Sequence, residues 1–279
     1  RRAKAPIASA RDHNGKIIFL SEPFSRYIEP KVEQATFDVL SECGYDVHVL
    51  SVTGSGASLM SKGFVDAARR HAGKVLDALN LLDPTREAVI VGVEPPDIYM
   101  LKNDYADLLP VRADEIASRS SRTWLIDEYL LRSKNFTNLR VGNIPVQNNL
   151  DKIKRTIKFQ PHCHQRAEAP SPDGLPNGTS ATLELLSMCG FNVDLFETGC
   201  CGMAGTFGYE SEHYELSMQV GELSLFPLLR RSKDENQNIQ IVSSGAACRM
   251  QIHQGVGIDA RHPIELVRDY VVTSKTKKA

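Results

Sequence analysis

The chain has 279 residues, 42% of them hydrophobic, so it is long enough to bury a substantial core as one large or two modest domains. Its 33 basic and 34 acidic residues give a net charge of −1, which excludes recruitment of nucleic acid by a global electrostatic field. No apolar run approaches the roughly 18 residues of a membrane span, and the first residues lack the apolar stretch of a secretory signal.

The first half of the chain alternates short apolar runs with helical patterns. Residues 1–15 contain charges, proline and an Asn-Gly turn signal without periodicity, so we expect a linker or tail there. Apolar runs then predict strands, and amphipathic patterns predict helices, at 17–20 (strand), 32–43 (helix), 47–50 (strand), 62–82 (helix), 88–92 (strand) and 105–132 (helix). This alternation predicts an α/β fold, a parallel sheet with helices on both faces.

The asparagine-rich segment 133–153 is predicted to be a connector, after which the order of elements begins again. The second series is predicted at 156–159 (strand), 181–189 (helix), 193–196 (strand), 211–231 (helix), 239–242 (strand) and 263–272 (helix). Residues 154–279 are therefore expected to form a second α/β unit, after a first unit at 16–132.

An offset of 146 residues shows that the second unit repeats the first. Residues 39–47 fall on 185–193, with Leu, Ser, Cys, Gly and Val shared. At the same offset, Thr53-Gly-Ser-Gly falls on Gly199-Cys-Cys-Gly, so Gly54 and Ser55 stand where the second copy has cysteines. We therefore expect two tandem pseudo-repeats, with a cysteine site in the second copy and its counterpart lost from the first.

Four cysteines of the second copy each follow a predicted strand by a few residues: Cys163, Cys200, Cys201 and Cys248. The carboxyl ends of parallel strands share one edge of the sheet, so these thiols are expected to converge there. Thiol-rich sites select zinc or iron-sulfur clusters. Structural zinc sites usually use C-x-x-C pairs, so one adjacent pair with two remote cysteines favours a cluster, with zinc as the alternative.

Other residues around these cysteines are candidates for shaping or tuning the site. His162 and His164 flank Cys163 and would face opposite ways in an extended segment, so at most one points at the site. Gly199 and Gly202 bound the cysteine turn, and Arg249 either offsets cluster charge or bonds a carbonyl. Alternative interpretations of the turn are a redox-active thiol pair and a zinc-stabilised or metal-free docking module. By contrast, Cys43 and Cys189 precede helix-ending glycines and are expected to pack in the core.

Three segments resemble one known family: Gly199-Cys-Cys-Gly-Met-Ala-Gly, His162-Cys-His-Gln and Ala247-Cys-Arg. They are similar to the cysteine-rich CCG domain of the heterodisulfide reductase B subunit and the glycolate oxidase iron-sulfur subunit. Glu94-Pro-Pro-Asp and Ser61-Lys-Gly-Phe resemble the carboxyl-terminal part of single-chain FAD-linked oxidases, of the D-lactate and D-2-hydroxyglutarate dehydrogenase type.

The resemblance implies that the four cysteines hold an iron-sulfur cluster, a 4Fe-4S cluster by expectation, which passes electrons from a flavin to an acceptor. FAD and the hydroxyacid chemistry would then belong to a missing amino-terminal region or to a partner subunit, and no catalytic residue is expected here. The chain would be part of an oxidoreductase and inactive alone. Six cysteines without a disulfide framework predict a reducing compartment, the cytoplasm, with peripheral binding at the inner face of the membrane as a further option.

The chain departs from the family pattern at two places. Gly245 stands where the first cysteine of a later C-x-x-C would be, which leaves four thiols and favours an ordinary 4Fe-4S cluster over a five-cysteine cluster. In the first copy, the positions that match the four cysteines hold Pro23, Gly54, Ser55 and Asp97. We therefore predict that the first copy is structural.

Overall fold

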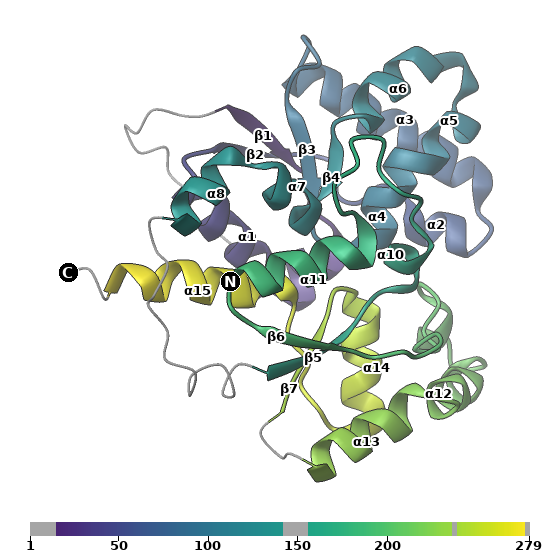
Figure 1. Ribbon diagram of the computed structural model, residues 1–279. Helices are drawn as coiled ribbons and strands as arrows, with labels where there is room; N and C mark the ends of the chain where they lie inside the picture. The colour runs from purple at the N-terminus through teal and green to yellow at the C-terminus, as the bar shows by residue number, and fades with distance from the viewer. Residues whose placement is uncertain (1–14, 142–155, 236–238, 277–279) are drawn as a thin grey trace. The chain divides into compact units, whose positions relative to one another are not determined.

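The computed structural model describes residues 15–141, 156–235 and 239–276. Contacts between residues divide the chain into two compact units, Arg1–Gly142 (unit 1) and Asn143–Ala279 (unit 2). Each unit is built on one parallel sheet with helices around it, which confirms the predicted α/β class (Figure 1). Of the predicted tail only Gly15 is among the described residues, and most of the predicted connector also lies outside them.

Unit 1 contains a four-stranded parallel sheet in the order β2-β1-β3-β4. The strands are β1 (Lys16–Phe19), β2 (Asp46–Val49), β3 (Val89–Gly92) and β4 (Thr123–Leu125). The main helices around them are α1 (Pro30–Glu42), α3 (Val65–Leu82), α6 (Ala113–Ser120), α7 (Ile126–Arg132) and α8 (Lys134–Val141). Shorter helical segments are η1 (Phe24–Ile28), α2 (Ala57–Ser61), α4 (Pro95–Tyr99), η2 (Met100–Asp104), α5 (Tyr105–Leu108) and η3 (Pro110–Arg112).

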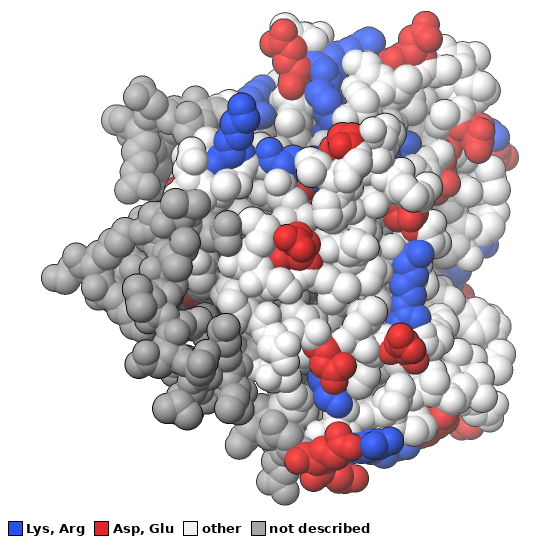
Figure 2. All heavy atoms as spheres, viewed as in Figure 1, with Lys and Arg blue, Asp and Glu red and all other residues white. Residues whose placement is uncertain are grey.

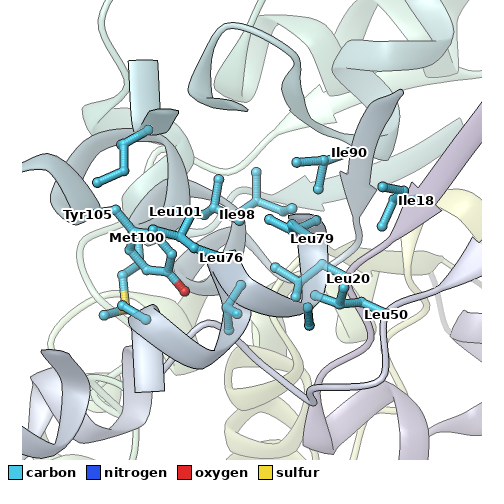
Figure 3. Packing of buried hydrophobic residues seen from close by; sticks show 14 of the residues in the cluster. Ile18, Leu20, Leu50, Leu76, Leu79, Ile90, Ile98, Met100, Leu101 and Tyr105 are labelled. Carbon is cyan, nitrogen blue, oxygen red and sulfur yellow. The ribbon is translucent and has the colours of Figure 1, made fainter. Parts of the chain in front are cut away.

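Successive side chains of β1 point to opposite faces of the sheet, and both faces are covered. Ile18 and Leu20 belong to a buried cluster with Leu76 and Leu79 of α3 (Figure 3). On the other face, the Phe19 ring meets a phenylalanine ring of α1 edge to face, with 5.1 Å between centroids. The uninterrupted apolar run of β1 is thus the pattern of a strand buried on both sides.

Unit 2 contains a three-stranded parallel sheet in the order β6-β5-β7. The strands are β5 (Thr156–Gln160), β6 (Asn192–Leu195) and β7 (Gln240–Ser243). The helices are α10 (Cys163–Ala167), α11 (Gly178–Met188), η4 (Phe207–Tyr209), α12 (Tyr214–Glu222), α13 (Leu225–Glu235), α14 (Ala246–Val256) and α15 (Pro263–Thr276). In both units the first strand lies between the second and the third, so the repeat seen in the sequence recurs in the strand order.

Three segments differ from the elements expected along the chain. The long helical pattern at 105–132 contains the strand β4, because a three-residue strand is too short to interrupt helical periodicity visibly. The helix expected at 211–231 is divided into α12 and α13 around Leu223 and Ser224. Helix α8 occupies the start of the segment expected to be connector.

Charges of both signs are present on the face shown in Figure 2. Figure 2 shows acidic and basic side chains interspersed over the visible face. This distribution agrees with the near-zero net charge. Within the described part of the chain, no helix combines the length and apolar character that crossing a bilayer requires.

Candidate metal centre

The four candidate cysteines lie after the carboxyl ends of the three strands of unit 2. Cys163, after β5, is the first residue of α10, and Cys248, after β7, is the third residue of α14. Cys200 and Cys201 lie in the irregular segment that follows β6. Because the strands are parallel and adjacent, all four residues belong to one edge of the sheet.

The sulfur atoms differ in exposure and in contacts. The Sγ atoms of Cys201 and Cys248 are 3.3 Å apart, and both residues are buried. Cys200 and Cys163 are exposed. The Cys200 sulfur accepts a hydrogen bond from the Gly202 amide at 3.3 Å. None of the four is in a disulfide. The site therefore has a buried pair of thiols and two thiols at the surface.

Burial and neighbouring thiols raise the pKa of three of these cysteines. The hydrogen bond with Cys201, together with burial, raises the pKa of Cys200 far above its usual range. For Cys201, the hydrogen bond with Cys200 lowers the pKa, but the hydrogen bond with Cys248 and burial outweigh it. Burial and the charge of Cys200 raise the pKa of Cys163. These thiols are therefore protonated at neutral pH, and a bound metal would have to displace their protons.

The two histidines beside Cys163 have different environments. His162 caps the start of α10 and is buried, whereas His164 is exposed in the first turn. The expectation of opposite facing assumed an extended segment, but the chain turns into a helix at Cys163. The Nδ1 atom of His162 accepts the His164 amide at 3.1 Å, and burial, with the charges of His164 and Arg249, lowers the pKa of His162 to about 3. The His162 ring is thus neutral, with its proton on Nε2.

The same histidine ring accounts for the glycine at position 245. A Cβ atom at Gly245 would lie 2.3 Å from Cδ2 of His162 and 3.3 Å from the sulfur of Cys248. Real Cβ atoms do not approach a neighbour as closely as the first of these distances, so a fifth cysteine here would require the ring to move. The geometry fits four thiols and a buried imidazole rather than five thiols.

Polar side chains without a recognisable signal in the sequence hold the cysteine turn in place. Gly202 has φ +100°, and a Cβ atom there would meet the carbonyl of Ser217, so only glycine fits. The Ser217 hydroxyl donates to the Gly202 carbonyl at 2.9 Å, and the Gly199 amide donates to the Ser224 hydroxyl at 3.1 Å. Helix α12 and a residue just after its end therefore anchor both glycines that bound the turn.

Two arginines make hydrogen bonds to loops at this edge of the sheet. Arg249 is 4% exposed, and its Nη1 donates to the carbonyls of Ser243 and Ser244 at 2.8 and 2.9 Å. Arg166 of α10 donates to the carbonyl and the hydroxyl of Thr198, two residues before Cys200. Of the two roles expected for Arg249, carbonyl bonding is the one seen. Arg166 carried no recognisable signal in the sequence.

The site offers sulfur donors but, in the part of the chain that the structure describes, no preformed site for a single ion. Among the described residues, no group of three or more His, Cys, Asp and Glu side chains is arranged to hold one metal ion. A cluster takes one thiolate at each of its irons, so its cysteines need not share a single coordination sphere. The Ser244 hydroxyl, directly before Gly245, is buried without a hydrogen-bond partner in the described structure. Cysteine sulfurs are soft metal ligands, and a buried hydroxyl can donate a hydrogen bond to a cluster sulfur, so both suit an iron-sulfur group.

Comparison with known proteins points to dehydrogenases. No protein-family model matches the chain. The chain is 23% identical over 256 residues to D-2-hydroxyglutarate dehydrogenase of Pantoea ananatis, which covers 92% of this chain and 22% of that protein. It is 22% identical over 255 residues to D-2-hydroxyglutarate dehydrogenase of Escherichia coli K12, which covers 91% and 22%.

A second kind of relative is a subunit of the anaerobic glycerol-3-phosphate dehydrogenase of Escherichia coli K12. It is 23% identical over 271 residues, which cover 95% of this chain and 61% of that subunit. The chain thus spans about a fifth of the length of the first relatives and less than two thirds of the second. It is distantly homologous to parts of these dehydrogenases, and so is related to oxidoreductases.

Proposed function

We propose that this chain is an electron-transfer part of an FAD-linked 2-hydroxyacid dehydrogenase or oxidase, and that unit 2 holds a 4Fe-4S cluster through Cys163, Cys200, Cys201 and Cys248. The observation that carries the proposal is the placement of these four cysteines after three adjacent strand ends at one sheet edge, with the sulfurs of Cys201 and Cys248 3.3 Å apart. The distant homology to D-2-hydroxyglutarate dehydrogenases supports the reaction class. The FAD-binding domain would belong to the same full-length protein or to a partner subunit.

The residues of unit 2 would divide the work of holding such a group. The four cysteines supply the thiolates, and a bound 4Fe-4S cluster supplies one-electron transfer. The buried guanidinium of Arg249 offsets negative charge that four thiolates bring into the protein. His162, directly before Cys163, and Ser244, whose buried hydroxyl has no partner in the described structure, would supply hydrogen-bond donors, and hydrogen bonds to cluster sulfurs tune reduction potential.

The exposure of the thiols supports a relay at the protein surface. Cys163 and Cys200 are exposed, whereas Cys201 and Cys248 are 5% and 2% exposed. A cluster held by all four cysteines would be bound on its buried side by Cys201 and Cys248. Its other side, bound by Cys163 and Cys200, would be at the protein surface. An electron donor or acceptor docked on this edge would then approach the group closely.

Iron and acid-labile sulfide, measured after anaerobic purification of the full-length enzyme, test the proposal. We expect both elements in the wild-type protein and their loss, with loss of acceptor reduction, in Cys201→Ala. The matched control is Cys189→Ala, which removes a buried cysteine at the end of α11 and should retain both elements. Wild-type protein with stoichiometric zinc, or without any metal, would refute the proposal.

A thiol-disulfide function is the second candidate, because the Cys201 and Cys248 sulfurs are only 3.3 Å apart. The raised pKa of Cys200 and of Cys201 argues against it, since the thiolate is the reactive form. Mass spectrometry after mild oxidation of the metal-free protein separates the two. A Cys201–Cys248 disulfide that forms and is reduced during turnover would favour the thiol-disulfide function. Turnover that depends on iron would exclude that function.

A further inference from the structure

The strand register gives unit 1 a counterpart for each cysteine of unit 2. Lys16 pairs with Asp46 in unit 1, and Thr156 pairs with Asn192 in unit 2, so β1 corresponds to β5 and β2 to β6. In the same way, Ile17 pairs with Val89, and Ile157 pairs with Gln240, so β3 corresponds to β7. The two sheets can therefore be compared residue by residue without reference to side chains.

Counting onward from these strands equates the same positions that the internal repeat suggested. Asp97 lies eight residues after Val89, as Cys248 does after Gln240, and each is the third residue of its helix. The other corresponding pairs are Pro23 with Cys163, Gly54 with Cys200, and Ser55 with Cys201. The following glycines, Gly56 and Gly202, have φ values of +99° and +100°, so the two turns share the left-handed backbone conformation at this position.

The counterparts in unit 1 converge as the cysteines do. A Cβ atom at Gly54 would lie 3.3 Å from Oδ1 of Asp97 and 3.6 Å from Cδ of Pro23. Asp97 Oδ1 accepts two hydrogen bonds from Ser55, one from its amide at 2.6 Å and one from its hydroxyl at 2.8 Å. The pair Ser55 and Asp97 thus makes the contact that Cys201 and Cys248 make in unit 2.

The polar groups of this turn in unit 1 are bonded within the protein. The Gly54 amide donates to the Ser21 carbonyl at 2.7 Å, and His71 Nε2 lies 3.0 Å from the Gly54 carbonyl. The hydroxyl of Tyr105, a member of the buried cluster of Figure 3, donates to the Ser55 carbonyl at 2.8 Å. Protein groups therefore cross-link the ends of β1, β2 and β3 in unit 1.

We propose that unit 1 is a metal-independent copy of the unit 2 site, in which the hydrogen bonds between Asp97 and Ser55 take the place of the cross-link that a metal group held by Cys201 and Cys248 would supply. Asp97 is in this sense a positioning residue that joins the turn after β2 to the helix after β3. The inference rests on the proposed function for its comparison with unit 2. The hydrogen bonds of Asp97 to Ser55 lie within unit 1 and do not depend on a metal.

Hydrogen exchange followed by mass spectrometry on the full chain tests the proposal. In Asp97→Ala the Ser55 amide loses its acceptor, so we expect exchange in residues 50–60 to become about tenfold faster or more. Asp97→Asn keeps one acceptor oxygen and should recover part of the protection. The control is Asp107→Ala, which removes an exposed carboxyl from α5 of the same unit and should leave residues 50–60 unchanged.

A second arm removes the metal from anaerobically purified wild-type protein with an iron chelator. We expect faster exchange in residues 196–206 of unit 2 and no change in residues 50–60 of unit 1. Unchanged exchange of residues 50–60 in Asp97→Ala, or equal loosening of both turns on metal removal, would overturn the proposal. Protein that contains no iron before chelation would refute the proposed function instead, and the Asp97 variants would still decide the role of this residue.

Discussion

Replacing Glu22 by Gln should make the stability of unit 1 depend less on pH between 5 and 8.5. Glu22 is 1% exposed, and its carboxylate accepts the amides of Phe24 and Ser25 at 2.6 and 2.5 Å. Burial and the charge of Asp97 raise its pKa from 4.5 to about 7, more than these hydrogen bonds lower it. The folded unit therefore binds this proton more tightly than the unfolded chain does.

The sign and size of the effect follow from linkage. Because the folded pKa lies above the unfolded pKa, the stabilisation is complete below about pH 4.5 and is lost as pH rises through 7. A difference of this size corresponds to about 3 kcal/mol of unfolding free energy in the wild type. Gln stays neutral but keeps only one of the two acceptor oxygens, so we expect Glu22→Gln to be about 1 to 3 kcal/mol less stable than the wild type at pH 5 and to lose less stability than the wild type between pH 5 and 8.5.

Urea unfolding followed by tryptophan fluorescence measures this change selectively. Trp124, the single tryptophan of the chain, lies in β4 of unit 1, with Arg132 stacked 4.1 Å from its ring centroid. The control is Glu87→Gln, which neutralises an exposed carboxyl of the same unit. Equal loss of stability between pH 5 and 8.5 in the wild type and in Glu22→Gln would show that Glu22 does not carry the pH dependence.

Three further predictions address the packing of unit 1 and the cysteine site. Arg119→Met should lower the unfolding free energy of unit 1 by about 3 to 5 kcal/mol in the same assay, because the fully buried guanidinium pairs with Asp83; an unchanged urea midpoint would contradict this. Gly202→Ala should abolish iron loading, whereas Gly257→Ala, at φ +63° with open space around it, should keep it, as iron analysis will show. Gly245→Cys should reduce iron content rather than add a ligand, because the His162 ring occupies the space beside Gly245. A higher iron-to-protein ratio in this variant would contradict the prediction.

Much of the α/β organisation could be predicted because it depends on local patterns. Buried parallel strands have short apolar runs, and the helices between them have amphipathic periodicity, so the order of elements was visible along the chain. The internal offset also located Gly54 and Ser55 as counterparts of the cysteine pair, and strand register equates the same positions. The strand β4 was missed because three residues between two helices leave no periodic signal.

The candidate site was predictable in position and not in detail. Cysteines that follow parallel strands share a sheet edge, so the placement of Cys163, Cys200, Cys201 and Cys248 at one edge followed from the fold class. Their exposure, and the contact between Cys201 and Cys248, depend on how α10 and α14 pack, which no local pattern records. The residues that bond the cysteine turn, Ser217, Ser224 and Arg166, could not be predicted for the same reason, since serines and arginines are common on any helix.

The sequence by itself determined the fold class, the repeat and the edge of the sheet where the thiols lie, because strand and helix patterns and internal similarity are properties of neighbouring residues. Only the tertiary structure decided that His162 fills the space beside Gly245 and that Asp97 bonds Ser55 where the other unit has two thiols. These contacts join residues from different strand ends, and their distances depend on the packing of whole helices against the sheet.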